Sequence, residues 1–218
     1  MISKTQILFS LVYLLILFCY FFSETSGNLT RRAINKMALA SMFLINSAIS
    51  IFKKGITPFS AILLLAIFFC FLGDFVLLFS FSAAGVMFIC ANLSYAIYLL
   101  AYYFNCQINL LPALVVFITV LLTYYLLVKK KYFKLKLISI YSGYIFSVII
   151  QGSLGASLFI QASNPAERFI GLGLLFFMIA DFFLFSYNYH QKKNSILRIN
   201  SAFYFIGMLL ITFYCYLV

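Results

Sequence analysis

The chain has 218 residues, of which 66% are hydrophobic and only 9% are charged, and its formal net charge at pH 7 is +11. A soluble domain of this length needs more polar surface than this composition supplies, which excludes a soluble protein. The sequence predicts an all-α, polytopic integral membrane protein, with residues 1–218 in a single transmembrane domain. Its basic residues gather in short connections, where they set topology and meet lipid headgroups, so no nucleic-acid partner is expected.

Eight segments are long and apolar enough to cross the hydrocarbon core, which takes about 20 residues of helix. The first resembles a signal peptide but lacks an A-x-A cleavage site, so we interpret it as a retained helix. The connections are short and leave no room for a separate soluble domain. In chain order the predicted spans are residues 6–22, 33–52, 57–79, 82–104, 110–128, 137–160, 169–189 and 202–218, which we expect to pack in one bundle.

Lysine and arginine are distributed unevenly between the two sides of these spans. Connections rich in them usually stay cytoplasmic. This rule predicts that both termini lie on the non-cytoplasmic side. We expect the protein to lie in a bacterial cytoplasmic membrane, with membrane lipids as partners. The oligomeric state stays open. Of the 15 basic residues, the first, third, fifth and seventh connections carry Arg31, Arg32, Lys36, Lys129, Lys130, Lys131, Lys134, Lys136, Lys192, Lys193 and Arg198, and the other side carries Lys4, Lys53, Lys54 and Arg168.

Two lone aspartates lie inside apolar runs: Asp74 in "FFCFLGDFVLLFS" (68–80) and Asp181 in "LFFMIADFFLFSY" (175–187). Both spans are predicted to run in the same direction and to end at the basic side. The carboxyl groups would then lie roughly 8 and 12 Å from their helix ends, at similar depth. A charged group inside a span is costly, so it usually faces the protein interior and has a function. The alternative is a structural hydrogen-bond anchor between helices.

Other polar side chains are predicted to reach the same level from the helices that begin at that side: Lys36, Asn92, Tyr95, Tyr144 and Tyr204. Together with the aspartates they would line a polar chamber. Two carboxyl groups in one chamber tend to share one proton, so that one acts as an acid and the other as a base or charge stabiliser. The likeness of the two aspartate stretches also fits a weak repeat of four helices plus four, although Phe and Leu are so common that chance matches are expected.

Other catalytic classes lack their residue sets. The five cysteines form no CxxC pair and His190 is the only histidine, so no metal or cofactor site and no catalytic triad is predicted. Serines lack a G-x-S-x-G context. Lys36 has two interpretations: contact with a substrate phosphate, or a positive-inside residue whose ammonium reaches the lipid headgroups.

Five stretches resemble, in order and spacing, the YhhN-type lysoplasmalogenases, a family of eight-span membrane enzymes. The resemblance covers nearly the whole chain, and the two aspartate motifs are its most specific parts. It implies hydrolysis of the vinyl ether bond of a lysophospholipid substrate, a lysoplasmalogen, to a fatty aldehyde and glycerophospho-ethanolamine or glycerophospho-choline. The stretches are "NKMALASMFLI" (35–45), "FLGDFVLL" (71–78), "MFICANLSYAIY" (87–98), "GLGLLFFMIADFFL" (171–184) and "SAFYFIGMLLI" (201–211).

The chain departs from the family pattern at two positions. The family usually has a Lys-Pro pair or a nearby proline where Lys36 is followed by Met37, and this change is expected to alter only the helix start. It commonly has a histidine where this chain has Asn92. Asparagine forms hydrogen bonds but does not titrate, so any proton shuttle at position 92 is lost.

Vinyl ether hydrolysis is limited by proton transfer to the carbon remote from oxygen, and water then adds to the oxocarbenium ion. We therefore expect Asp74 and Asp181 to be the catalytic pair, with neither assigned as the acid and with no metal required. Lys36 would bind the substrate phosphate. The other predicted substrate-binding residues, some of which would orient the glycerol or the water, are Asn92, Tyr95, Tyr144 and Tyr204.

Two other functions stay open at this point. A small proton-coupled transporter is one, because two intramembrane carboxylates in half-chain repeats also describe a coupling site. A catalytically weak relative that binds lysolipids is the other, and Asn92 motivates it. Placement separates hydrolase from transporter: a lipid hydrolase needs its carboxylates near one interface beside a cation, whereas a carrier needs them at the midplane.

Overall fold

The structure is a computed structural model that describes residues 4–25, 28–130, 132 and 138–217. These residues form eight α-helices and no strand, which confirms the all-α fold class. All eight helices are long and apolar enough to cross a membrane, so the chain is a multi-pass membrane protein. They are α1 (Lys4–Thr25), α2 (Leu29–Lys54), α3 (Pro58–Val76), α4 (Phe81–Cys106), α5 (Leu111–Lys129), α6 (Ile138–Gln161), α7 (Pro165–Tyr189) and α8 (Asn194–Leu217).

Several helices extend beyond the predicted apolar spans, because a helix continues through polar turns that an apolar count leaves out. The Asn28 side chain caps α2 by accepting the backbone N–H of Arg31 at 3.0 Å. Asn164 caps α7 in the same way. By contrast, α3 stops at Val76, and Ser80 then caps α4. This early end leaves Asp74 in the last turn of its helix.

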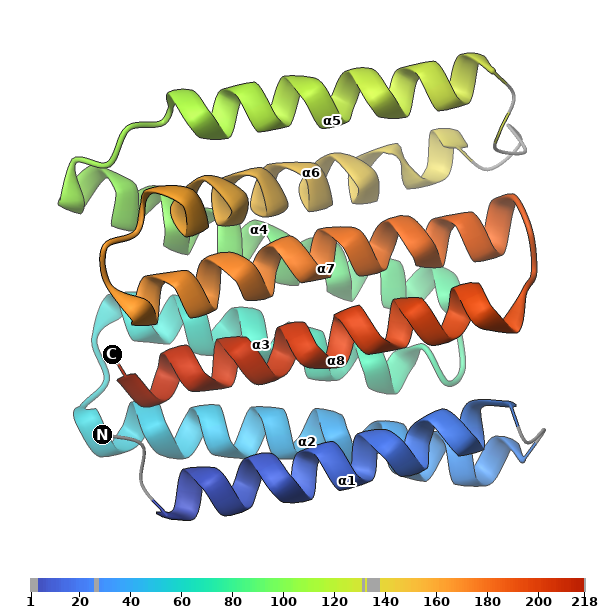
Figure 1. The fold of residues 1–218 in the computed structure, drawn as a ribbon, viewed down its shortest axis with the longest axis horizontal. Helices are drawn as coiled ribbons and strands as arrows, with labels where there is room; N and C mark the ends of the chain where they lie inside the picture. The colour runs from blue at the N-terminus through green and yellow to red at the C-terminus, as the bar shows by residue number, and fades with distance from the viewer. Residues whose placement is uncertain (1–3, 26–27, 131, 133–137, 218) are drawn as a thin grey trace.

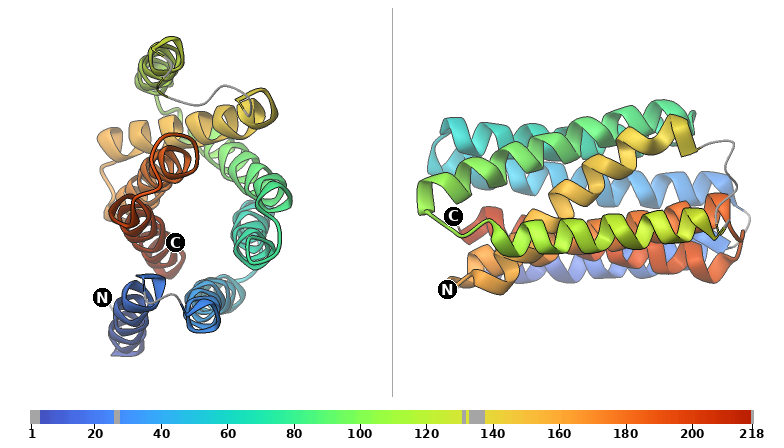
Figure 2. Two further views of the ribbon diagram at one scale, coloured as in Figure 1. Left: turned by 90° about the vertical axis from the view of Figure 1, so that its right-hand side faces the viewer. Right: turned by 90° about the horizontal axis from the view of Figure 1, so that it is seen from above.

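Seven of the eight described helices form a ring, and α5 lies outside it, as Figure 1 and Figure 2 show. The order around the ring is α1, α2, α3, α4, α6, α7 and α8, and contacts between α8 and α1 close it. Helix α2 also contacts α8 across the ring, whereas α5 packs mainly on α6. The weak repeat of four helices plus four stays a prediction, and the first helices of its two halves, α1 and α5, occupy different positions.

Helix α7 is held between α6 and α8 by close contacts at glycines. A Cβ atom at Gly171 would lie 2.6 Å from the backbone nitrogen of Phe159 in α6. One at Gly173 would lie 2.9 Å from the carbonyl oxygen of Gly207 in α8. Real side chains do not pack this closely, so small residues allow the backbones to approach. These contacts fix the helix that carries Asp181.

The connections divide the bundle into two ends. The α1–α2, α3–α4, α5–α6 and α7–α8 connections lie at one end, and α1 begins and α8 ends at the other (Figure 1). We call the first the basic end, because its described basic residues are Arg31, Arg32, Lys36, Lys129, Lys130, Lys192, Lys193 and Arg198. Lys131, Lys134 and Lys136 belong to the same predicted side and lie outside the described residues.

Candidate active site

A cavity of about 60 Å³ lies inside the ring toward the basic end. We call it the polar cavity. Both aspartates line it, so α3 and α7 bring Asp74 and Asp181 to one space. A volume of this size is large enough for water molecules. Its charged and polar lining residues are Tyr20, Glu24, Arg32, Lys36, Asp74, Asp181, Asn200, Ser201 and Tyr204.

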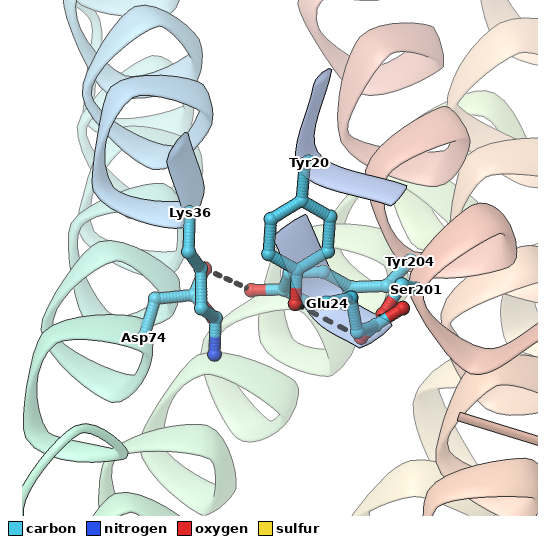
Figure 3. Close-up of polar contacts among 6 residues, drawn as sticks. All are labelled: Tyr20, Glu24, Lys36, Asp74, Ser201 and Tyr204. Carbon is cyan, nitrogen blue, oxygen red and sulfur yellow. Dashed lines mark hydrogen bonds and ion pairs between the residues drawn. The ribbon is translucent and has the colours of Figure 1, made fainter. Parts of the chain in front are cut away.

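Asp74 is buried and has a partner on each carboxylate oxygen. The Lys36 ammonium from α2 forms an ion pair with its Oδ1 at 2.9 Å. The Tyr204 hydroxyl from α8 donates to its Oδ2 at 2.7 Å. Figure 3 shows these side chains pointing toward one another from three helices. These two contacts, one of them from a cation, hold the Asp74 carboxyl group in a fixed position.

Asp181 is bonded differently. The Tyr144 hydroxyl from α6 donates to its Oδ1 at 2.6 Å. Among the described residues, the one ion pair is that of Lys36 with Asp74, so Asp181 has no cation beside it. Its second oxygen is therefore available to carry or release a proton.

A second cavity, of about 90 Å³, lies between α5, α6 and α7. We call it the apolar cleft, because its walls are almost entirely hydrocarbon. Asp181 and Tyr144 are exceptions in that wall. Among the described residues, Asp181 alone lines both the polar cavity and the apolar cleft. The other lining residues of the cleft are Val120, Thr123, Tyr124, Leu127, Ile145, Val148, Ile149, Met178, Phe182 and Phe185.

The model of the YhhN family matches residues 5–214, which include nearly all of the eight helices and both aspartates. The chain belongs to the YhhN family. This confirms the resemblance that the five stretches indicated. Searches among curated proteins and among solved structures found no match.

Two of the YhhN protein's predicted substrate-binding residues lie away from both cavities. Asn92 is buried and donates to the Ser147 hydroxyl at 3.3 Å. Tyr95 is buried with its hydroxyl 4.0 Å from the Cys70 sulfur. Neither residue lines the polar cavity or the apolar cleft. Both side chains are buried between helices, where Asn92 contacts α6 and Tyr95 contacts α3.

Glu24 is a site residue that sequence reasoning missed. It is 8% exposed and lies in the last turn of α1, where it lines the polar cavity. Its Oε1 accepts hydrogen bonds from Ser201 at 2.6 Å and from Tyr20 at 3.1 Å. The predicted first span ended at residue 22, so Glu24 was counted as part of a connection. The available signal was its rarity, since the chain has only four acidic residues.

Arg32 and Asn200 were also missed. Arg32 lies in the first turn of α2 and lines the polar cavity. Asn200 donates to the backbone oxygen of Ala180 at 2.8 Å, which ties α8 to the turn of α7 that carries Asp181. Both residues lie outside the predicted spans, because the polar turns at the start of α2 and α8 do not count as apolar sequence. Among the described residues, no group of three His, Cys, Asp or Glu side chains is arranged to hold a metal.

The site therefore combines three carboxyl groups with different partners, cations at the basic end, and an apolar cleft at its side. Such a set can move a proton, stabilise a positive charge and bind a molecule that is polar at one end and apolar at the other. These capabilities are those of a site for an amphiphile.

Proposed function

We propose that this YhhN protein hydrolyses the vinyl ether bond of lysoplasmalogens. The family includes lysoplasmalogenases. The observation that carries the proposal is that Asp181 lines both the polar cavity and the apolar cleft. A lysolipid with its headgroup in the first and its chain in the second has the start of that chain beside Asp181. The vinyl ether of a lysoplasmalogen lies at this junction.

Asp181 is proposed as the general acid. Its protonated carboxyl group donates a proton to the vinyl carbon remote from oxygen, and the carbon–carbon double bond supplies the electron pair. The other vinyl carbon and the ether oxygen then share the positive charge of an oxocarbenium ion. Tyr144, which donates to one carboxyl oxygen of Asp181, orients the group so that the other oxygen holds the transferable proton.

Asp74 is proposed as the charge stabiliser. Lys36 and Tyr204 hold its carboxylate in place, and its negative charge favours the oxocarbenium ion in a site of low dielectric constant. Water adds to the cation and gives up one proton to the Asp181 carboxylate, which restores the acid. The carbon–oxygen bond of the hemiacetal to glycerol then breaks. The remaining proton from water passes to the glycerol oxygen, which leaves as the alcohol, and the carbonyl of the aldehyde forms.

The phosphate group is proposed to bind near Arg32 and Lys36, which both line the polar cavity. Lys36 already pairs with Asp74, but an ammonium has three donors and can contact a phosphate as well. Arg32 offers planar, bidentate donors that suit phosphate oxygens. The positive-inside rule further suggests that the basic end faces the cytoplasm.

A proton-coupled transporter is less well supported by the position of the carboxylates. Asp74 lies in the last turn of α3, and Glu24 in the last turn of α1. A carboxylate near one interface, beside cations, suits an enzyme that takes a lipid by its headgroup. A coupling site for alternating access usually lies near the midplane, reachable from both sides.

The deciding experiment is aldehyde release from a lysoplasmalogen by the purified protein. A lysolipid with a saturated ether at the same position is the substrate control, because it has no vinyl carbon to protonate. We expect aldehyde from the first lipid alone. Lysolipid binding without aldehyde would replace the hydrolase with a binding relative, and substrate-dependent proton flux in vesicles would replace it with a transporter.

A further inference from the structure

One carboxylate oxygen of Glu24 has no hydrogen-bond donor among the described residues. Ser201 and Tyr20 both donate to Oε1, whereas no donor among the described residues reaches the buried Oε2. A buried charged acceptor without a donor is costly, so native structures usually provide a partner. The side chain is more than nine-tenths buried and lines the polar cavity. A ligand bound in the polar cavity is therefore a candidate for the missing donor.

The charged residues around the polar cavity indicate which type of ligand group could donate to Glu24. Glu24 from α1 and the Lys36–Asp74 pair all line the polar cavity, and Figure 3 shows Glu24 apart from that pair. Arg32 and Lys36 supply positive charge, and the Glu24 carboxylate forms no ion pair with any residue that the structure describes. Such a wall suits a ligand that carries an anion and a cation a few bonds apart. A phosphate bound at Arg32 would be followed by a positively charged donor at Glu24.

Depth along the helices agrees with this order. Glu24 is followed by a single further residue of α1, whereas eight residues of α7 follow Asp181. At 1.5 Å per residue, Asp181 lies roughly 12 Å inside its helix end. The outermost part of a bound lysolipid therefore meets Glu24, while the bond beside the chain reaches Asp181.

We infer that Glu24 is a specificity-determining residue that binds the primary ammonium of an ethanolamine headgroup through its free Oε2. The inference rests on the proposed function only in taking a lysolipid as the ligand. It goes further in naming the headgroup that the site prefers. An ethanolamine ammonium has three N–H donors, whereas a choline ammonium has none and would leave Oε2 buried without a partner. Sites built to hydrogen-bond a ligand group discriminate strongly against analogues that lack it.

Binding of non-hydrolysable lysolipids tests this assignment independently of catalysis. The ligands are saturated ether lysolipids whose headgroup nitrogen carries zero, one, two or three methyl groups. Their affinities are measured by displacement of a radiolabelled ethanolamine lysolipid from the purified full-length protein. We expect similar affinity for the first three, since each keeps an N–H, and a loss of about tenfold or more at the third methyl group. A smooth decline with each methyl group would indicate steric fit and overturn the inference, as would equal binding of all four.

Glu24→Gln is the matching variant, because it keeps the size of the side chain and an oxygen for Ser201 and Tyr20. We expect the preference for ethanolamine over choline to fall to near unity. The control is Glu167→Gln, since the carboxylate of Glu167 also accepts from a tyrosine, Tyr102, at 2.7 Å, but lies at the opposite end of the bundle. This control should keep the wild-type preference. If Glu24→Gln fails to fold, the methylation series on wild-type protein still decides the question.

The outcomes separate this inference from the proposed function. A step at the third methyl group without any aldehyde release would support the role of Glu24 and reject the hydrolase. Aldehyde release with no headgroup preference would do the reverse. If no lysolipid binds, both are overturned.

Discussion

Asp74 and Asp181 lie in similar stretches of sequence but in different bonding environments. Asp74 is held on both oxygens, by a lysine from α2 and a tyrosine from α8. Asp181 is held on one oxygen by a tyrosine from α6, and lies where the polar cavity meets the apolar cleft. Similar local sequence therefore carries two different roles, because the partners come from other helices.

The difference matters because the proposed reaction needs two unlike carboxyl groups. A group that must give up a proton cannot also be held permanently as an ion pair. A group that must stabilise a cation should stay ionised throughout. The environments divide these tasks without any difference in residue type, as paired catalytic carboxylates commonly do. The comparison can be tested by removing each group and measuring activity and stability separately.

The largest expected effect is the loss of activity in Asp181→Asn. Asparagine keeps the shape of the side chain but has no proton to transfer to carbon. We expect aldehyde release to fall by about 10²–10⁴-fold, the usual contribution of a general acid. The thermal unfolding midpoint in detergent should stay close to the wild-type value, because no ion pair is broken. Full activity in this variant would reject Asp181 as the acid.

Asp74→Asn is expected to lower stability as well as activity. Removal of the carboxylate leaves the Lys36 ammonium buried and unpaired, and breaking a buried ion pair costs about 3–5 kcal/mol. The measurement is thermal or denaturant unfolding of the purified protein. A stability equal to that of Asp181→Asn would contradict the distinction between the two aspartates.

The double variant Lys36→Met with Asp74→Leu is the control for that prediction. Replacing both members of a buried ion pair with apolar residues is often neutral or stabilising. We expect stability to recover toward the wild-type value while aldehyde release stays absent. This result would separate the structural part of the Asp74 effect from its chemical part.

Much of the fold could be predicted from the sequence, because a membrane span depends on the summed hydrophobicity of about 20 residues. All eight helices were located. Their ends were not, since Asn28 and Asn164 start helices in polar turns that an apolar count ignores. The arrangement of seven helices in a ring with α5 outside it depends on packing between helices. The local sequence contains no pattern that predicts this packing.

The candidate site was accessible in part for the same reason. A lone carboxylate in an apolar span stands out, so Asp74 and Asp181 could be selected. Lys36 was found as a cation but not as the partner of Asp74, because the two residues lie on different helices. Glu24 was missed because it lies at the boundary of a span, where a charge is unremarkable. Asn92 and Tyr95 were expected in the polar chamber because of their depth in the fourth span, and depth does not specify which way a side chain faces.

A smaller effect is expected from the two tyrosines that donate to the aspartates. Tyr144→Phe removes the hydrogen bond that Asp181 accepts from Tyr144, so the acid loses its orientation, and we expect roughly tenfold slower aldehyde release with little change in substrate affinity. Tyr204→Phe leaves Asp74 paired with Lys36, so its effect on rate should be smaller. Steady-state kinetics of both variants test the order. A larger loss in Tyr204→Phe would indicate that the charge stabiliser, rather than the acid, limits the reaction.

The smallest effect is expected at position 92. Asn92→His restores the residue that the family resemblance leads one to expect, but Asn92 lies behind the site and donates to Ser147, which in turn donates to the backbone oxygen of Tyr144 at 2.7 Å. A proton from position 92 would have to pass through that serine before reaching Asp181. We therefore expect a change in rate of less than about tenfold, through small shifts of α6. Asn92→Gln, which adds one methylene without a titratable group, controls for packing. A large gain in the histidine variant alone would mean that a proton relay reaches Asp181 from α4, and that Asp181 does not act as an independent acid.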